Sequence, residues 1–439
     1  MGLEEGVDAA FDPGAFIRQM VRFEVELAHA QADLGLVPVA AALSIERVAA
    51  SFRPDPAVLA GRGAEVGSIA IPLVAELVAR VAAEYPDAAR HVHAGTTSQD
   101  VLDTAMVLCT REALSYIDAV TAEALDAARR LAFGNARVPV LARTLLQPAG
   151  VTSLGLKAAR WHDSLARCRR RLAAAAGPAM QVSLGGAFGT LDSLGDAGPS
   201  VRARLADRLG LGDDGRSWHT SREAWVGLAA DAALLAGTAA KIARDVALMS
   251  QAEVGEVSEP SAAGRGGSSA MPQKRNPVLA MSVLSASQSL PGLLSNLLAG
   301  MVQEHERGLG NWQNELTQWP EVFRRTFVAL RALGRLLDGL RVDADRCRMN
   351  IGSTLETVFS EAVAGLVAPV LGRSEAHSWL EALCAEALLR QERLSVLVAR
   401  DLVADPRLAG MDPVALAACF DLDAVVERSA RLIPALVRD

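Results

Sequence analysis

Aromatic side chains, paired cysteines and excess positive charge are all scarce in this 439-residue sequence. Aromatic residues make up 4% of the chain, and its formal net charge is -7 at pH 7. No CxxC pair occurs among the five cysteines, which are Cys109, Cys168, Cys347, Cys384 and Cys419. This spacing argues against a zinc site and a disulfide framework, and the acidic balance argues against a nucleic-acid partner. The first residues lack the basic and apolar regions of a signal peptide. We therefore expect a reduced, cytoplasmic protein without a bound metal.

Charge is also absent from a long run between Asn276 and Gln303. The run is long enough for a transmembrane helix. Polar residues and a proline interrupt it, however, at Ser282, Ser285, Ser287, Gln288, Ser289, Pro291, Ser295 and Asn296. So many polar groups are costly in hydrocarbon. The run predicts a helix buried on all sides by protein, with no membrane partner.

What the sequence has in abundance is apolar residues at helical spacing. Ala and Leu dominate Thr121–Ala132 and Trp225–Met249, while no stretch shows the alternation and turns of a β-hairpin. A helix of twenty-five residues spans about 37 Å and needs partners on several sides. We predict an all-α fold of three helical domains, 1–95, 96–342 and 343–439. The central domain is a bundle of long helices that other copies of the chain complete.

The first segment with candidate chemistry runs from His91 to Asp100. Thr97 can cap a helix whose third position is Asp100, and a helix start with the hydroxyls of Thr97 and Ser98 suits a carboxylate ligand. The alternative is that both residues only cap the helix. His91 and His93 lack a third metal ligand nearby. His93 is therefore interpreted as a polar or acid–base group.

The densest segment is Gly264–Pro277, in which three glycines precede the sequence SSAMPQKRNP. Ser268 supplies a hydroxyl, and Lys274 and Asn276 supply a cation and an amide. Serine is a weak base unless a cation, N–H donors and the exclusion of water assist it, and a lid with glycine hinges can provide all three. A flexible linker would explain the glycines but not the MPQKRNP sequence. A third segment, Ala142–Ala149, contains Arg143, Thr144 and Gln147 and would pass by itself as the end of a loop.

Gly267–Pro277 resembles the GSSxMPxKxNP signature of the fumarase/aspartase superfamily. The resemblance extends to the TSQD and Arg143–Pro148 segments and implies an all-α homotetramer that needs no cofactor and shares each active site between subunits. It also implies that Ser268 is the general base or proton donor of a carbanion reaction. Lys274 and Asn276 would bind a substrate carboxylate and stabilise the aci-carboxylate intermediate. Thr97 and Ser98 would hold another carboxylate.

Within the superfamily, stretches such as GGAFGTLDSLGD and QEHERGLGNWQ are most similar to bacterial 3-carboxy-cis,cis-muconate cycloisomerases. Leu145 stands where lyases that expel hydroxide or an amine carry a histidine. A carboxylate, whose conjugate acid has a pKa of about 4, attacks or leaves without that help. A tricarboxylate substrate needs several cations, and the candidates beside Lys274 are Arg143, Arg265 and Arg307, with Gln147 as a polar neighbour.

Other substrates and functions are also compatible with the sequence. Nitrite is also a weakly basic leaving group, so nitrosuccinate elimination to fumarate is the main alternative. Gln273, where the cycloisomerases usually have histidine, leaves the substrate undecided. An adenylosuccinate lyase-like activity fits less well because of Leu145, and retention of Ser268, Lys274 and Asn276 argues against a catalytically silent structural homologue. Arg307 could instead form a solvated ion pair with its acidic neighbour Glu304.

Overall fold

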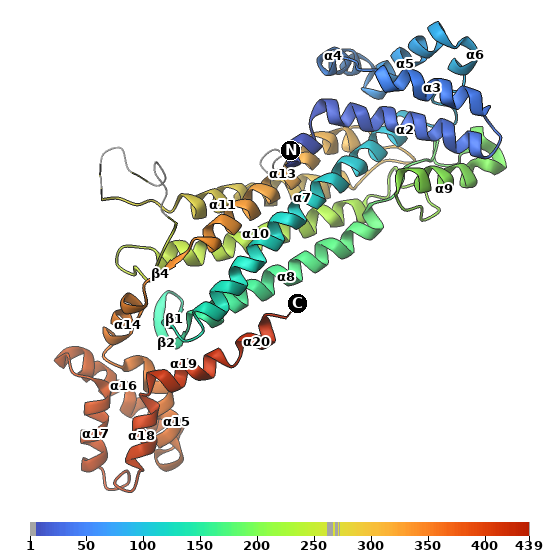
Figure 1. The fold of residues 1–439 in the computed structure, drawn as a ribbon. Helices are drawn as coiled ribbons and strands as arrows, with labels where there is room; N and C mark the ends of the chain where they lie inside the picture. The colour runs from blue at the N-terminus through green and yellow to red at the C-terminus, as the bar shows by residue number, and fades with distance from the viewer. Residues whose placement is uncertain (1–5, 261–266, 268–270, 272, 439) are drawn as a thin grey trace. The chain divides into compact units, whose positions relative to one another are not determined.

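The computed structural model describes residues 6–260, 267, 271 and 273–438, and these are mostly helical, as predicted (Figure 1). The chain divides into two compact units, each built from three stretches of sequence. Unit 1 consists of Met1–Thr121, Cys168–Thr238 and Ser285–Leu330, and unit 2 consists of Ala122–Arg167, Ala239–Leu284 and Arg331–Asp439. The predicted domain boundaries near residues 95 and 343 stay a prediction.

Four long helices contribute residues to both units. They are α7 (Ser98–Gly134), α8 (Leu154–Ala179), α10 (Glu223–Met249) and α13 (Asn311–Asp338). Their lengths confirm the long helices that the Ala- and Leu-rich periodicity predicts. In unit 1 the rings of Trp225 on α10 and Trp319 on α13 stack with centroids 3.7 Å apart. The Trp319 indole N–H donates to the Thr110 hydroxyl of α7 at 2.8 Å, so the buried polar atom of this ring is satisfied.

The remaining helices of unit 1 include an N-terminal group. This unit contains α1 (Gly6–Ala10), α2 (Pro13–Asp33), α3 (Val39–Ser51), α4 (Pro56–Val66), α5 (Ala70–Glu84), α6 (Pro86–Ala89), η1 (Asp192–Ala197), α9 (Gly198–Leu209) and α12 (Leu290–Gly300). Helix α2 begins at Pro13 because the Asp12 carboxylate caps it by accepting from the backbone N–H groups of Gly14 and Ala15. It packs against α3 and α9 (Figure 1).

Unit 2 holds the C-terminal helices and two small sheets. It contains β1 (Pro139–Thr144), β2 (Gln147–Ser153), β3 (Val257–Ser258), most of α11 (Val278–Gln288), β4 (Arg341–Val342), α14 (Ala344–Gly352), η2 (Thr357–Phe359), α15 (Ser360–Leu371), α16 (Arg373–Arg390), α17 (Leu394–Ala404), α18 (Pro413–Cys419), α19 (Leu422–Ala430) and α20 (Ile433–Leu436). Helices α15 to α18 enclose a core of their own that includes Val363, Val367, Leu380 and Leu397.

The hairpin formed by β1 and β2 corrects the expectation of a chain without strands. The two strands pair antiparallel, with Thr144 opposite Gln147 and a bulge between Ala142 and Arg143. The turn is made by Leu145 and Leu146, whose φ angles are +51° and +68°. Such turns are normally recognised by Asn and Gly, which tolerate positive φ. Because two leucines occupy these positions, the sequence carries no turn signal.

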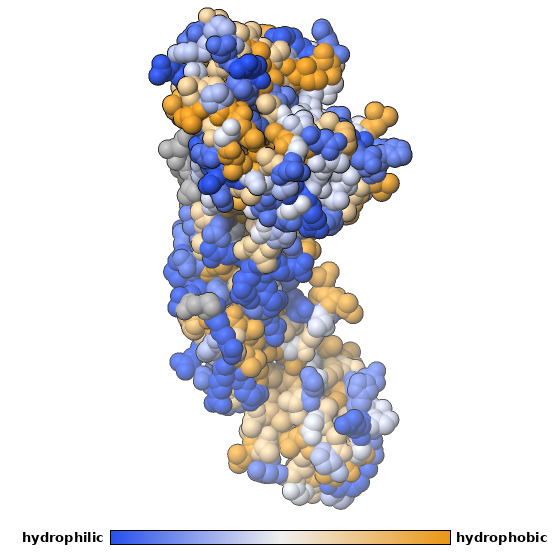
Figure 2. Space-filling model, turned by 90° about the vertical axis from the view of Figure 1, so that its right-hand side faces the viewer, coloured by the Kyte–Doolittle hydropathy of each residue, from blue (hydrophilic) through white to orange (hydrophobic). Residues whose placement is uncertain are grey.

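Two apolar segments are long enough to cross a membrane by length and composition, counting the described residues. They are Glu223–Met249, whose most apolar window is 50% buried, and Val278–Gly300, with 28% buried. The second contains α11 and α12, so this chain alone does not bury the uncharged run on all sides as predicted. Exposed apolar side chains also occur on the N-terminal helices, at Val39, Leu43 and Val58. Figure 2 shows apolar patches between hydrophilic ones on one face of the molecule.

Candidate active site

In unit 1, the buried carboxylate of Asp100 holds the loop that precedes α7. The backbone N–H of Thr97 donates to it at 3.0 Å, which is the predicted relation between a helix cap and the third helical residue. Asp100 also accepts hydrogen bonds from the Thr96 hydroxyl, the Ser183 hydroxyl, the backbone N–H groups of Gly185 and Gly186, and Nε2 of His219. One carboxylate therefore fixes the Thr96–Thr97 loop against the Gly185–Gly186 segment.

Asp100 is an anion at neutral pH rather than a proton carrier. Burial raises its pKa, but the hydrogen bond and charge of His219 and the two glycine N–H groups outweigh burial and hold the pKa below its ordinary value. An ionised acceptor forms stronger hydrogen bonds than a neutral one. The sequence identified Asp100 only as a capping partner and missed His219.

Thr97 and Arg307, both predicted to bind substrate, contact each other. Nη1 of Arg307 donates to the Thr97 hydroxyl at 2.9 Å, and Nη2 donates to the Ala187 carbonyl at 2.8 Å. The buried Nε of Arg307 has no partner among the described residues. Glu304 accepts from the backbone N–H of Leu309, and within the described part of the chain the guanidinium of Arg307 contacts Thr97, Gly186 and Ala187 rather than Glu304. The Thr97 hydroxyl thus accepts a hydrogen bond from a cation, in addition to any role of Thr97 in capping α7.

His93 contacts a buried carboxylate, Glu24, that the sequence did not predict as its partner. Its Nδ1 lies 2.7 Å from Oε1 of Glu24, whose side chain is fully buried. Burial lowers the pKa of His93, but the hydrogen bond and charge of Glu24, together with the charge of Asp100, raise it above its ordinary value. His93 also has a φ of +60°, a conformation that costs about 1–3 kcal/mol in a non-glycine residue.

A signal for Glu24 is nevertheless present in the sequence. Glu24 and Gln31 interrupt the buried stripe of α2, which includes Met20 and Leu27 at helical spacing. Gln31 also reaches this loop, since its amide donates to the Ala94 carbonyl at 2.7 Å. Buried polar residues on an apolar stripe require partners, so the two together indicate a polar loop packed on α2.

Beneath the loop lies a buried ion cluster one turn further along α7. Arg222, which directly precedes α10, donates to Asp103 at 2.9 Å and to Glu315 of α13 at 2.5 Å. Gln99 joins them, because its amide donates to Asp103 and to the His219 carbonyl. Burial raises the pKa of Glu315 against the lowering effect of Arg222. The cluster ties together the starts of α7, α10 and α13, and the loop residue Thr97 directly precedes α7.

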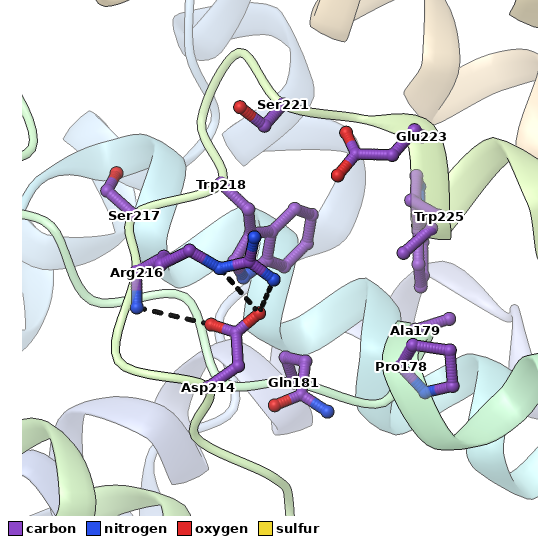
Figure 3. Close-up of a pocket in the computed structure, with 11 residues that line it drawn as sticks. Pro178, Ala179, Gln181, Asp214, Arg216, Ser217, Trp218, Ser221, Glu223 and Trp225 are labelled. Atoms are coloured by element: carbon purple, nitrogen blue, oxygen red, sulfur yellow. Dashed lines mark hydrogen bonds and ion pairs between the residues drawn. The ribbon is translucent and has the colours of Figure 1, made fainter.

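A cavity beside this cluster is too small for the predicted substrate. It is lined by Trp218 and Trp225, with the Arg216–Asp214 ion pair at its side (Figure 3). Its volume is about 60 Å³, whereas pockets for small organic ligands hold about 300–1,000 Å³. Trp218 instead stacks on the guanidinium of Arg222 at 4.6 Å, so this cavity belongs to the packing around the ion cluster.

In unit 2, Arg143 anchors the hairpin. Its Nη1 and Nη2 donate to the two oxygens of Glu256 at 2.9 and 2.7 Å, and Asn350 donates to the same carboxylate at 3.0 Å. Glu256 is fully buried, and such a two-pronged pair fixes the orientation of both groups. The structure therefore shows a structural partner for Arg143, while its predicted role in substrate binding stays a prediction. Gln147 is exposed at the start of β2.

The segment around the signature is tied down just before it and just after it. Glu259 accepts hydrogen bonds from the N–H groups of Leu279 and Ala280 at 2.9 and 2.8 Å, at the start of α11. Gly267 pairs with Arg275 in an isolated antiparallel bridge. Lys274 is exposed and Asn276 is half-buried. Ser268 and Arg265 lie outside the described residues, so their predicted roles are not addressed by the geometry.

His91 and His93 are residues of a type that can bind metal ions. No group of three His, Cys, Asp or Glu side chains that could hold a metal ion occurs in the part of the chain that the structure describes. Nε2 of His91 accepts a hydrogen bond from its neighbour Arg90, and His93 is bound to Glu24. In unit 1 these segments offer a hydroxyl, an imidazole and a guanidinium group, and in unit 2 they offer a guanidinium group and an exposed ammonium. These groups suit a substrate with several carboxylates.

Comparison with known proteins identifies the class to which this fold and these segments belong. A family model described as Lyase matches residues 16–292. The chain is therefore an enzyme of the Lyase family, in the fumarase/aspartase superfamily.

Three relatives illustrate its place in that family. A 3-carboxy-cis,cis-muconate cycloisomerase of Bradyrhizobium diazoefficiens is 40% identical over 98% of this chain and 96% of that protein. A nitrosuccinate lyase of Streptomyces davaonensis is 41% identical over 89% of this chain and 84% of that protein. The crystal structure of the 3-carboxy-cis,cis-muconate lactonizing enzyme of Pseudomonas putida superposes with a TM-score of 0.89 at 36% identity, covering 98% of this chain and 96% of that one. The expected superfamily fold is confirmed.

Proposed function

We propose that this enzyme is a cycloisomerase that lactonises 3-carboxy-cis,cis-muconate to 4-carboxymuconolactone in protocatechuate breakdown. The observation that carries the choice of reaction type, an attacking or leaving group that needs no proton donor, is Leu145. This residue lies at the tip of the β1–β2 turn, where its side chain is 97% exposed and contributes no acid or base. A reaction whose attacking group is an ionised carboxylate needs neither. The 40% identity to a cycloisomerase over nearly the whole chain supports the same choice.

The proposed reaction is an addition across a double bond. An oxygen of one substrate carboxylate forms a bond to the carbon β to another carboxylate, and the electron pair of the double bond moves onto that second carboxylate as an aci-carboxylate. Ser268 then delivers a proton to the α carbon, which restores the carboxylate. Lys274 and Asn276 stabilise the charge that develops, as preorganised donors do in other enzymes of carbanion chemistry. Thr97, Ser98 and Arg307 hold a carboxylate away from the reacting carbon.

We also propose that the chain works as a homotetramer. Of the most apolar window in Val278–Gly300, only 28% is buried within one chain. In water, such a surface is stabilised by burial against protein, and identical copies supply it symmetrically. This arrangement would also give each active site residues from more than one copy.

Nitrosuccinate elimination is the second candidate. Its product nitrite is a weak base that departs without a proton donor, so Leu145 fits this reaction too. The 41% identity to a nitrosuccinate lyase is a specific reason to retain it.

Parallel assays with both substrates test the proposal. The purified tetramer is incubated with 3-carboxy-cis,cis-muconate, and the loss of the conjugated-diene absorbance is followed in the ultraviolet. Separate samples with nitrosuccinate are assayed for fumarate and nitrite. We expect turnover of the first substrate. Fumarate from the second without turnover of the first would replace the proposal with the alternative, and inactivity on both would revive the structural homologue.

A further inference from the structure

The pair formed by Glu24 and His93 does more than the packing of a loop requires. Glu24 is fully buried in α2, and its Oε2 has no partner among the described residues. An unpaired oxygen on a buried carboxylate is costly unless the charge of the group is used. Oε1 receives the whole charge-assisted hydrogen bond from Nδ1 of His93, which is 2.7 Å away.

The hydrogen bond to Glu24 determines which nitrogen of the His93 ring carries a proton. A carboxylate only accepts hydrogen bonds, so Nδ1 of His93 is the nitrogen that carries a proton in either charge state. The other nitrogen, Nε2, has no hydrogen bond to any described residue, and the side chain is 24% exposed. When the ring gains its second proton, that proton is on Nε2. The exposed end of the ring is then a cationic donor.

The backbone conformation at His93 is unfavourable by itself and is held by neighbouring residues. His93 has a φ of +60°, and Gly95 follows with a φ of +74°, so the chain turns sharply between Val92 and Thr96. The turn is held from two sides, by Gln31 on the Ala94 carbonyl and by Asp100 on the Thr96 hydroxyl. A strained residue that its surroundings hold in place is typical of a group oriented for function.

We propose that Glu24 is a positioning residue that orients His93 and keeps it cationic, so that Nε2–H binds a carboxylate of the substrate. This inference rests on the proposed function for its substrate class. It goes beyond it by assigning the role of His93 and by adding Glu24, which contacts no substrate. A tricarboxylate then has a cationic imidazole in addition to Arg307 and Lys274.

The charged groups around His93 give the direction of the pH dependence. Glu24 on α2 and Asp100 on α7 are both negative and favour the imidazolium. The other charged groups nearby are engaged elsewhere, His219 with Asp100 and Arg307 with Thr97. Replacing Glu24 by glutamine removes the negative charge closest to the ring while keeping an oxygen that accepts from Nδ1. Deprotonation of His93 should then begin at a lower pH.

The first test is a titration that needs no substrate. The histidine ring signals of the purified enzyme are followed by NMR across pH in the wild type and in Glu24→Gln. The signal that is missing in His93→Gln is assigned to His93. We expect the His93 midpoint to fall by one pH unit or more in Glu24→Gln, which is about a tenfold change in proton affinity. Glu46→Gln is the matched control, because Glu46 contacts His29 at 3.0 Å but is largely exposed. It should leave the His93 midpoint unchanged.

The second test uses turnover of the muconate substrate. In Glu24→Gln we expect KM at pH 7.5 to rise about tenfold with kcat changed less than threefold, and the rise of KM with pH to begin at a lower pH. Glu24→Asp, which keeps the charge, should retain a higher His93 midpoint than Glu24→Gln. If the glutamine variant does not fold, Glu24→Ala takes its place, and the same fall of the His93 midpoint below that of the wild type is expected. An unchanged His93 midpoint in Glu24→Gln overturns the inference. Inactivity of the wild type on both substrates overturns the proposed function instead, and the titration still decides the inference.

Discussion

Two of the turns that place non-glycine residues in the left-handed backbone region are stabilised in opposite ways. The turn at His93 is held by Glu24, Gln31 and Asp100, all from unit 1. The turn at Leu145 and Leu146 in unit 2 extends into solvent, with the two side chains 97% and 72% exposed. The first turn is preorganised within one chain. The second is anchored at its base, where Arg143 binds Glu256.

The comparison indicates what each region is for. A loop fixed by a buried anion can present Thr97 and Arg307 in one geometry before any ligand arrives, which lowers the entropy lost on binding. An exposed apolar tip with a strained backbone stabilises nothing within its own chain. A partner copy of the chain is the natural contact for it under the proposed tetramer.

The largest expected effect is on kcat, from a substitution of Ser268, which lies outside the described residues. Ser268→Ala should lower kcat by about 10³-fold, because proton delivery by a positioned group contributes about 10²–10⁴-fold. Circular dichroism and the oligomeric state of the variant should match the wild type. Near wild-type turnover would show that the proton comes from elsewhere, and the fixed loop around His93 would become the first place to look.

Asp100→Ala tests whether the first turn is as rigid as its hydrogen bonds suggest. Removing a buried, paired carboxylate should cost about 3–5 kcal/mol in the free energy of unfolding, measured with urea. The matched control is Asp118→Ala, which breaks the exposed pair with Arg169 and should cost about 0–1 kcal/mol. Equal effects of the two substitutions would contradict the role of Asp100 as an anchor.

The stability that Asp100 contributes also has a definite pH dependence. Its pKa in the folded protein lies below the ordinary value of 3.8. The unfolded chain therefore binds the proton more tightly, so the contribution is fully present above pH 3.8 and is lost as the pH falls through the folded pKa. The difference in stability between the wild type and Asp100→Ala should shrink in that acidic range.

Arg307→Lys tests the cation that the fixed loop holds. A lysine cannot span the Thr97 hydroxyl and the Ala187 carbonyl as the guanidinium does. We expect KM for the tricarboxylate to rise about 10- to 100-fold, equivalent to about 1.4–2.8 kcal/mol, with a smaller change in kcat. Arg171→Lys, in the exposed pair with Asp231, is the control and should change KM less than twofold. An unchanged KM in Arg307→Lys would leave Arg307 a purely structural residue.

The smallest effect is expected at the second turn. The double substitution Leu145→Asn and Leu146→Gly installs residues that tolerate positive φ and should stabilise the protein by about 1 kcal/mol in urea. Leu389→Asn, at an exposed leucine of α16 without positive φ, should give no such gain. A loss of stability that depends on protein concentration would instead show that the leucines contact another copy, which would sharpen the contrast between the two turns.

Periodicity and motif determined much of this protein in advance. The spacing of Ala and Leu predicts the long helices, and the signature predicts the superfamily, because helices and catalytic loops both depend on residues close together in the chain. The relation between Thr97 and Asp100 could be predicted for the same reason. The hairpin was missed because Leu145 and Leu146 are not turn residues.

Tertiary structure alone decided the partners of the charged side chains. Glu24 and His93, Arg143 and Glu256, and Arg222 with Asp103 and Glu315 are far apart in sequence and meet only when helices pack. Whether an arginine binds substrate or anchors a strand depends on which carboxylate lies within about 3 Å of it, and hydrogen bonding is too short-ranged for sequence spacing to specify. The sequence by itself determined the enzyme superfamily, and the packing decided how its charged groups are held.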